Sequence, residues 1–236
     1  MCGRFSRYTD TRTFSHLLGL DTPNPALHQK YNQPPGLYCL AAASDPHNPE
    51  SISMQTLFWG FTPSWATQPA QAMINARSET AGTKPYFRKG FAKRRCLVAA
   101  DNWFEWQRSC TPKQPYALAP QSSEPFFMAG IWSLARSLPD DHPGAGQRTF
   151  AILTRPADPQ IQDVHHRMPV VLTPAGARAW LEAGEDPADL KTRLEQHRHE
   201  RFLTWPVSPR VNNPDNDDAA VIDPLLPRDV PAPRVT

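Results

Sequence analysis

The chain of 236 residues is long enough for one large domain or two small ones with a real hydrophobic core. Charged residues make up 20% of it and balance to a net charge of +2, which excludes a domain-wide basic field, so any nucleic-acid surface must be local. The four cysteines show no C-x-x-C spacing, no secretory segment precedes them, and no apolar run approaches the roughly 20 residues of a membrane span. We therefore expect a soluble cytoplasmic protein without structural disulfides, metal or cofactor.

The predicted elements begin with a short helix over 9–20, where Thr9 or Asp10 can cap and Phe14, Leu17 and Leu18 share one face. Short extended runs, separated by Pro, Gly, Asn and Asp, follow to about residue 155. The chain has 27 prolines, about twice the usual share, which favours turns and extended segments. The predicted strands cover residues 37–43, 52–60, 96–100, 103–106, 115–118, 126–132 and 149–154.

Helices return late in the chain. Two are expected over 173–184 and 186–200, where Thr173 and Asp186 can cap and the proline after each suits the first helical position. A shorter helix is expected from Asp158, and the Pro-rich segment 224–236 is expected to be a loosely ordered tail. We predict one α+β domain over 1–223, built on a mostly antiparallel twisted sheet or open barrel with flanking helices.

The opening stretch MCGRF places a cysteine directly behind the initiator methionine. Removal of Met1, which the small Cys2 side chain permits, leaves an α-amine and a thiol on adjacent carbons of one residue. The reference pKa values of these groups are about 7.7–8.0 and about 8.5, so both nucleophiles are usable near neutrality. Such a 1,2-aminothiol can capture an aldehyde, whereas the alternative is a surface position without a role.

Two polar stretches are unusual for a plain β-core. In MINARSET, Asn75, Arg77 and Glu79 alternate, so on a strand all three point to one face; a solvated edge is the alternative. In VHHRMP, adjacent His165 and His166 follow the predicted short helix. We expect the two rings to point in different directions, so that at most one is catalytic, while a structural role for either stays open.

The segment DNWFEW brackets Glu105 between Phe104 and Trp106. A carboxylate among aromatic side chains is partly desolvated, which raises its pKa toward the range useful for proton transfer. An exposed glutamate on an alternating strand is the other interpretation. Cys39 and Cys96 lie in apolar runs, and we interpret both as small core hydrophobes.

Nine segments occur in the order and spacing typical of one family: MCGRF, YNQPPG, FWGFTPSW, NARSET, RRCLVAADNWFEW, KQPY, FAILT, HHRMP and PVSPRVNN. The chain thereby resembles the SOS response-associated peptidase (SRAP) family from Cys2 to about Asn213. The resemblance implies an abasic-site sensor that cross-links to abasic sites in single-stranded DNA. It implies that Cys2, once N-terminal, forms a thiazolidine with the abasic aldehyde, and that Asn75, Glu105 and His165 line the site.

The resemblance also implies a groove for a single strand with a gap in its base stack. Arg4 and Arg77 suit phosphates, and Trp65 and Trp106 suit stacking or wedging against bases, although packing is an alternative for Trp65. The basic and aromatic run over 84–95 suits tracking of the backbone. The complete set of predicted DNA contacts is Gly3, Arg4, Asn32, Trp65, Arg77, Trp106 and Thr154.

Three functions stay open on the sequence. A cross-linking enzyme would shield the lesion, with lyase activity on the side and self-removal of Met1. An N-terminal-nucleophile cysteine peptidase would use the same thiol to cleave an amide, and a non-covalent reader of modified DNA would need only the groove. The expected partners are single-stranded DNA with abasic sites and the replication machinery. We expect a monomer that is nucleoid-associated when bound to DNA.

Overall fold

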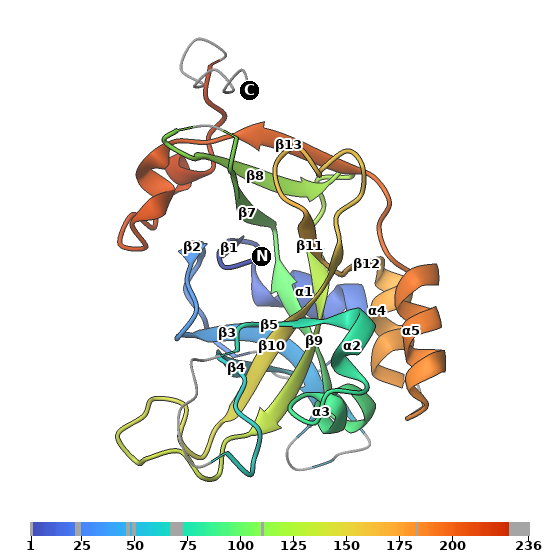
Figure 1. Cartoon of the computed structure of the whole chain (residues 1–236). Helices are drawn as coiled ribbons and strands as arrows, with labels where there is room; N and C mark the ends of the chain where they lie inside the picture. The colour runs from blue at the N-terminus through green and yellow to red at the C-terminus, as the bar shows by residue number, and fades with distance from the viewer. Residues whose placement is uncertain are drawn as a thin grey trace.

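The computed structural model describes residues 2–21, 25–45, 48, 51–66, 73–109, 111–182 and 184–226. Within them the predicted α+β class is confirmed (Figure 1). The strands are β1 (Phe5–Arg7), β2 (Lys30–Gln33), β3 (Tyr38–Ser44), β4 (Ile52–Trp59), β5 (Asn75–Arg77), β6 (Arg95–Ala100), β7 (Asn102–Gln107), β8 (Gln114–Pro120), β9 (Phe126–Leu134), β10 (Arg148–Pro156), β11 (Arg167–Pro169), β12 (Val171–Leu172) and β13 (Phe202–Pro206). The helices are α1 (Thr11–Leu18), α2 (Ser78–Ala81), α3 (Arg88–Lys93), α4 (Pro174–Glu182) and α5 (Pro187–Gln196), with 3-10 turns η1 (Pro209–Asn212) and η2 (Ala219–Val221).

The smaller of two sheets contains five strands in the order β13-β8-β7-β1-β2, and all of its pairings are antiparallel. Its strand β1 pairs with β7 through Phe5 and Trp103, and with β2 through Phe5 and Gln33. In Figure 1, β13, β8 and β7 lie at the top, and the N-terminus lies at the centre of the molecule beside β1. The first residues of the chain are therefore held between the two sheets.

The larger sheet closes on itself. Its ring runs β10-β4-β3-β6-β9, and β9 pairs back onto β10 through Arg148–Ile152 and Gly130–Leu134. The pairing of β10 with β4 is parallel, and the other pairings of the ring are antiparallel. The predicted mostly antiparallel sheet is thus present, and it forms a closed barrel where we expected a twisted sheet or an open barrel. Closure removes the sheet edges that an open barrel would expose.

The second half of β10 extends past the ring and carries a strand on each side. Ile152–Thr154 pair in parallel with β5, and Thr154–Pro156 pair in antiparallel fashion with β11. Because both partners share the same end of β10, the segments around Asn75 and His165 are brought to one side of the barrel. This arrangement positions the candidate site.

The three longer predicted helices are confirmed as α1, α4 and α5. Asp10 accepts from the Thr13 amide at 3.0 Å to cap α1. Thr173 accepts from the Gly176 amide at 3.1 Å, and Asp186 caps α5 in the same way at 3.1 Å. These caps satisfy amides that the first helical turn leaves without intrahelical partners, which is why the predicted boundaries hold at the N-terminal ends.

Two local predictions are wrong. The strand of MINARSET ends at Arg77, and α2 begins at Ser78, so Glu79 lies on a helix and not on the face that alternates with Asn75. The segment after Asp158 forms hydrogen-bonded turns through Val164 instead of a regular helix. In both segments tertiary contacts override a local pattern that is only a few residues long.

The barrel strands are buried on both faces. On β6, Leu97 and Ala99 pack against the layer of helices, whereas Cys96 and Val98 belong to the apolar cluster that fills the barrel interior. Gly130 faces the same interior, where a Cβ atom would lie only 2.8 Å from the Cys96 sulfur. The interior of so small a barrel is filled by side chains and leaves no channel.

The C-terminal segment after β13 covers one face of the smaller sheet. Val207 and Val211 pack with Phe104, and Pro224 forms an isolated bridge with Val207. Most of the predicted tail, residues 227–236, lies outside the described residues. Among the described helices, none combines the length and the apolar character needed to cross a membrane.

Candidate active site

Cys2 lies in the apolar cluster that fills the barrel and has no exposed surface. The Asn75 side-chain amide donates to the Cys2 carbonyl oxygen at 2.8 Å, so β5 fixes the backbone of the second residue. Burial raises the pKa of the Cys2 thiol far above its ordinary range, and the Glu105 carboxyl raises it further. The thiol is therefore protonated at neutral pH.

Glu105 stands on β7, opposite Tyr116 of β8, and only 2% of its surface is exposed. Burial raises the pKa of its carboxyl to about 7, which confirms the predicted direction. The predicted cause is wrong. Phe104 and Trp106 point to the other face of the sheet and pack with the C-terminal segment, whereas Trp103, two residues before Glu105, joins the cluster around Cys2. Glu105 is desolvated because it lies between the two sheets.

His165 follows the turns after β10 and is 4% exposed. Its Nε2 lies 3.9 Å from Glu105 Oε2, and its Nδ1 lies 3.0 Å from both the backbone nitrogen and the carbonyl oxygen of Arg167. The Arg167 carbonyl oxygen can accept a hydrogen bond from a protonated Nδ1, and the Arg167 N–H can donate to an unprotonated one. Nε2 faces the Glu105 carboxyl in either case. Burial lowers the pKa of His165 to about 4, so the ring is neutral at pH 7.

The expected divergence of the two histidines is wrong. The rings of His165 and His166 stack, with centroids 4.5 Å apart and an angle of 27° between their planes. His166 nevertheless lies at the surface, so the stack leads from the buried carboxyl outward. The structure therefore brings together Cys2, Asn75, Glu105 and His165, the four residues predicted to be catalytic, and places His166 above them.

An ion pair beside this group was missed by the sequence analysis. The Arg167 guanidinium bonds both carboxylate oxygens of Glu79, with Nη2 to Oε2 at 2.9 Å, and donates to the Thr154 carbonyl at 2.7 Å. The signal was present as opposite charges in NARSET and HHRMP, two segments far apart in the chain. Only the pairing of β5 and β11 with the same strand shows that these charges meet.

Three of the predicted DNA contacts lie where the C-terminal segment meets the smaller sheet. Arg4 donates to Asn32 at 2.7 Å and to the Val211 carbonyl at 2.9 Å. The Asn32 amide is 1% exposed and donates to backbone carbonyls of the same segment, and Trp106 donates to Asn212 at 2.7 Å. These side chains brace the C-terminal segment; their contact with DNA remains a prediction.

The other predicted DNA contacts differ in exposure. Trp65 is 63% exposed, with its ring edge-on to Tyr86 at 5.9 Å, so the packing alternative for Trp65 is wrong. Arg77 is exposed at the end of β5, and Gly3 is half-buried beside Cys2. Thr154 is fully buried, with its hydroxyl 3.3 Å from Arg167 Nη2. Trp65 and Arg77 are the members of this set that offer the most surface to a ligand.

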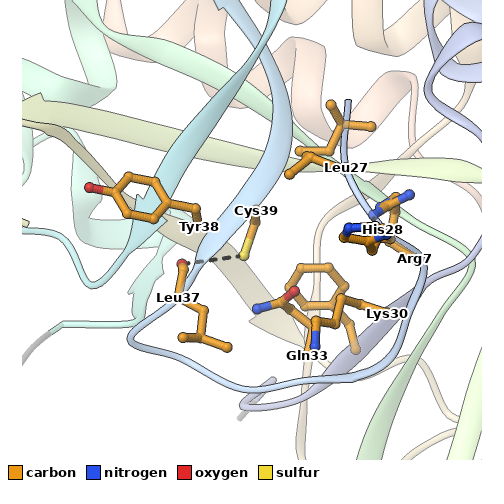
Figure 2. A pocket seen from close by; sticks show the side chains of 10 residues that line it. Arg7, Leu27, His28, Lys30, Gln33, Leu37, Tyr38 and Cys39 are labelled. Carbon is orange, nitrogen blue, oxygen red and sulfur yellow. Dashed lines mark hydrogen bonds between the residues drawn. The ribbon is translucent and has the colours of Figure 1, made fainter. Parts of the chain in front are cut away.

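Cys39 lines a different cavity, shown in Figure 2, of about 150 Å³ between β1, β2 and β3. Its thiol points to the Leu37 carbonyl oxygen at 3.7 Å, and burial raises its pKa far above the ordinary range. Cys39 and Cys96 are 3% and 0% exposed, which confirms them as core residues. In the part of the chain that the structure describes, no three His, Cys, Asp or Glu side chains gather to hold a metal ion.

The fold and the site define a class of protein in which a cysteine near the N-terminus is buried between a closed barrel and an antiparallel sheet, beside a carboxyl and an imidazole. A family model described as SOS response associated peptidase (SRAP) matches residues 1–214, and the chain belongs to this family. The resemblance stated from the sequence is thereby confirmed.

Several relatives match nearly the whole chain. It is 32% identical to the abasic site processing protein YedK of Escherichia coli over 95% of this chain and all of that one. It is 31% identical to the abasic site processing protein YoqW of Bacillus subtilis, over 94% of this chain and 99% of that one. A crystal structure of a phage-related protein from Bordetella bronchiseptica is 29% identical, with a TM-score of 0.70 over 87% of this chain and 94% of that one. A Bacteroides thetaiotaomicron protein, 22% identical, shares the fold with a TM-score of 0.79 over 95% of this chain and all of that one.

The buried carboxyl makes a testable contribution to stability. The folded chain holds the Glu105 proton up to a pKa of about 7, whereas the unfolded chain releases it near 4.5, so the free energy of unfolding contributed by this group falls as pH rises between these values. Glu105→Gln should remove that loss, and the variant should gain about 3 kcal/mol relative to the parent between pH 4.5 and 7. Urea denaturation at a series of pH values measures the difference.

His165 opposes this trend in the parent, because its lowered pKa makes stability rise with pH between about 4 and 6.5. Because the Glu105 carboxyl lies 3.9 Å from His165 Nε2, the titration of His165 is followed by NMR in variant and parent, and its contribution is subtracted from each. Exposed Glu124, in the turn between β8 and β9, supplies the control variant Glu124→Gln. A difference between Glu105→Gln and parent that does not change with pH would show that the Glu105 carboxyl is not perturbed in the folded chain.

Proposed function

We propose that this chain processes abasic sites and does so by cross-linking itself to them in single-stranded DNA through Cys2. The observation that carries the proposal is the fixed, fully buried Cys2, whose carbonyl oxygen is held by Asn75 and whose thiol lies under the electrostatic influence of Glu105. The names of the relatives, abasic site processing proteins, supply the substrate. The reaction requires that Met1 be removed, because only then is the Cys2 nitrogen an amine.

The chemistry needs two bonds to one carbon. An abasic deoxyribose opens to an aldehyde at C1′, and the Cys2 amine adds to it to give a carbinolamine. Loss of water leaves a Schiff base, and the Cys2 sulfur then adds to the imine carbon while the nitrogen takes up a proton, which closes a five-membered thiazolidine. The second step is intramolecular, so the pre-set distance between amine and thiol favours it strongly.

The neighbouring groups can move the protons that these steps require. A carboxyl with a pKa of about 7 exists in both forms at neutral pH, so Glu105 can give a proton to the departing water and accept one from the thiol. Neutral His165, whose Nε2 lies 3.9 Å from Glu105 Oε2, can exchange a proton with that carboxyl. The Asn75 amide is placed to orient the Cys2 backbone during attack.

Burial of Cys2 favours amine-first chemistry over the alternative of a cysteine peptidase. A peptidase needs a thiolate as its first nucleophile, and burial keeps the Cys2 thiol protonated. Self-removal of Met1 stays part of the proposal as a single event that precedes the cross-link. Abstraction of a C2′ proton from the Schiff base would expel the 3′ phosphate, which is the expected lyase side reaction.

Binding of a single strand is the second part of the proposal. Exposed Trp65, beside Tyr86, offers a ring on which an unstacked base can stack, and Arg77 offers a phosphate contact next to Asn75. The exposed cations Arg88 and Lys89 on α3, and Lys84 in the turn before it, extend this surface. We propose that the protein acts as a monomer on the nucleoid, at strands that the replication machinery exposes, and shields the lesion.

Replacement of the Cys2 sulfur separates the two nucleophiles. Cys2→Ser keeps a small residue that permits removal of Met1, and the assay uses variant protein shown by intact mass to lack Met1. The amine then remains, but a hydroxyl is a far poorer partner for ring closure than a thiol. The variant should stop at a Schiff base that borohydride traps and that leaks into strand cleavage, without a durable adduct. Denaturing gels with abasic single-stranded DNA, with and without borohydride, measure both products.

A matched variant removes the amine and keeps the thiol. One glycine inserted between Met1 and Cys2, confirmed by intact mass to remain on the chain, places the Cys2 nitrogen in a peptide bond. Adduct and strand cleavage should both be lost. Cross-linking by this variant at the parental rate would mean that the Cys2 amine is not the nucleophile.

Replacement of the buried carboxyl tests proton transfer. Glu105→Gln keeps the shape and removes the titrating group, so cross-linking at saturating DNA should slow by roughly 10²-fold while affinity for undamaged strands changes little. Single-turnover kinetics and a binding titration measure the two quantities. An equal loss of both would assign Glu105 to DNA positioning instead.

Removal of the exposed arginine tests the electrostatic part of binding. Arg77→Ala should weaken affinity for undamaged single strands and reduce the slope of log K against log salt by about 0.7, the value for one phosphate contact on a single strand. Titrations at several salt concentrations give the slope. A loss of affinity that is independent of salt would mean that Arg77 supports the fold and contacts no phosphate.

A further inference from the structure

The Arg167 guanidinium makes more hydrogen bonds than a simple surface ion pair provides. Its guanidinium forms a two-pronged bond with the Glu79 carboxylate, and Nη2 also donates to the Thr154 carbonyl oxygen at 2.7 Å. The Arg167 side chain is 9% exposed, whereas that of Glu79 is 43% exposed. The hydrogen bonds from Arg167 lower the pKa of Glu79, so the pair stays charged at neutral pH.

The pair joins two segments that do not pair with each other. Thr154 of β10 aligns with Arg77 of β5 on one side and with Pro169 of β11 on the other. Arg167 begins β11 and Glu79 lies in the first turn of α2, directly after β5. The guanidinium therefore crosses the end of β10 and ties together the strands that flank it.

One predicted catalytic residue lies on β5 and another lies directly before β11. Asn75, which holds the Cys2 carbonyl, opens β5, four residues before Glu79. His165 precedes Arg167 by two residues, and its Nδ1 lies 3.0 Å from the Arg167 backbone nitrogen. A displacement of the Arg167 backbone would thus be transmitted directly to the imidazole, and a displacement of α2 would be transmitted to Asn75.

We propose that Glu79 and Arg167 are positioning residues that fix the His165 ring relative to Asn75 and Cys2. The inference rests on the proposed function for its kinetic consequence, but the position of the ring is independent of it. Glu79 is the more exposed partner, and its loss would leave the buried Arg167 guanidinium without its counter-charge. The two-pronged bond sets direction as well as distance, which a single charge contact would not do.

Glu79→Gln is the decisive variant, because it keeps the shape of the side chain and removes the charge. With Arg167 released, His165 should loosen from its buried place. The maximal rate of cross-linking at saturating abasic DNA should fall at least tenfold, and affinity for undamaged single strands should not fall. Glu79→Asp, which keeps the charge and shortens the reach, should recover part of the rate.

The matched control is Asp189→Asn on α5. Asp189 is also bonded to an arginine, Arg193, at 2.8 Å, and its side chain is 42% exposed, close to the 43% of Glu79. It lies outside the group formed by Cys2, Asn75, Glu105 and His165. Asp189→Asn should therefore leave the maximal rate unchanged.

A second measurement does not depend on DNA. The titration of His165, followed by NMR of ring-labelled histidine and assigned with His165→Asn, should show a pKa near 4 in the parent and in Asp189→Asn, and a smaller upward shift in Glu79→Asp than in Glu79→Gln. In Glu79→Gln it should move toward 6.5, because a loosened ring regains water. If Glu79→Gln does not fold, Glu79→Asp decides the question. An upward shift of the His165 pKa in that variant supports the positioning role, and an unchanged pKa refutes it.

The two readouts separate this inference from the proposed function. An unchanged rate and an unchanged His165 titration in Glu79→Gln, in a parent that does cross-link, would overturn the positioning role alone. A parent that forms no adduct would overturn the proposed function, and the titration would still decide the positioning role. A loss of melting temperature in Glu79→Gln, with no change in rate or titration, would reduce the pair to a structural contact.

Discussion

β10 hydrogen-bonds to four other strands, and each pairing fixes one part of the candidate site. Its first half closes the barrel by pairing with β9 and β4, which buries the cluster around Cys2. Its second half carries β5, with Asn75, on one side and β11, close behind His165, on the other. Successive side chains of a strand point to opposite faces of the sheet. A one-residue shift in the pairing of β5 with β10 would therefore turn Asn75 away from the site.

The burial that this arrangement imposes sets the protonation of the site. Glu105 and His165 are both removed from water, and removal from water disfavours the charged form of each. The carboxyl therefore keeps its proton to a higher pH and the imidazole loses its proton at a lower one. Together with a protonated Cys2 thiol, this gives a site of largely neutral groups, in which a proton can move without first creating an isolated buried charge.

Much of the fold follows from local sequence. The strands with β-branched and aromatic runs and the helices with caps lie where the pattern predicts them, since each rests on neighbours within a few residues. What the sequence could not predict depends on contacts between distant segments: the change from strand to helix at Ser78, the stacking of His165 on His166, and the bond between Glu79 and Arg167. The raised pKa of Glu105 was predicted from its neighbours in sequence, yet it arises from the opposite sheet.

The position of the N-terminal residues is determined in the same long-range way. Phe5 is fixed by pairing with Gln33 and Trp103, and Arg4 is fixed by its bonds to Asn32 and to the C-terminal segment. Only Gly3 separates these anchors from Cys2, whose own carbonyl is bonded to Asn75. Cys2 is thus held from both sides by the two sheets and does not sit on a free arm. If Cys2 is the nucleophile that we propose, it loses little conformational freedom when it reacts, because folding has already removed that freedom.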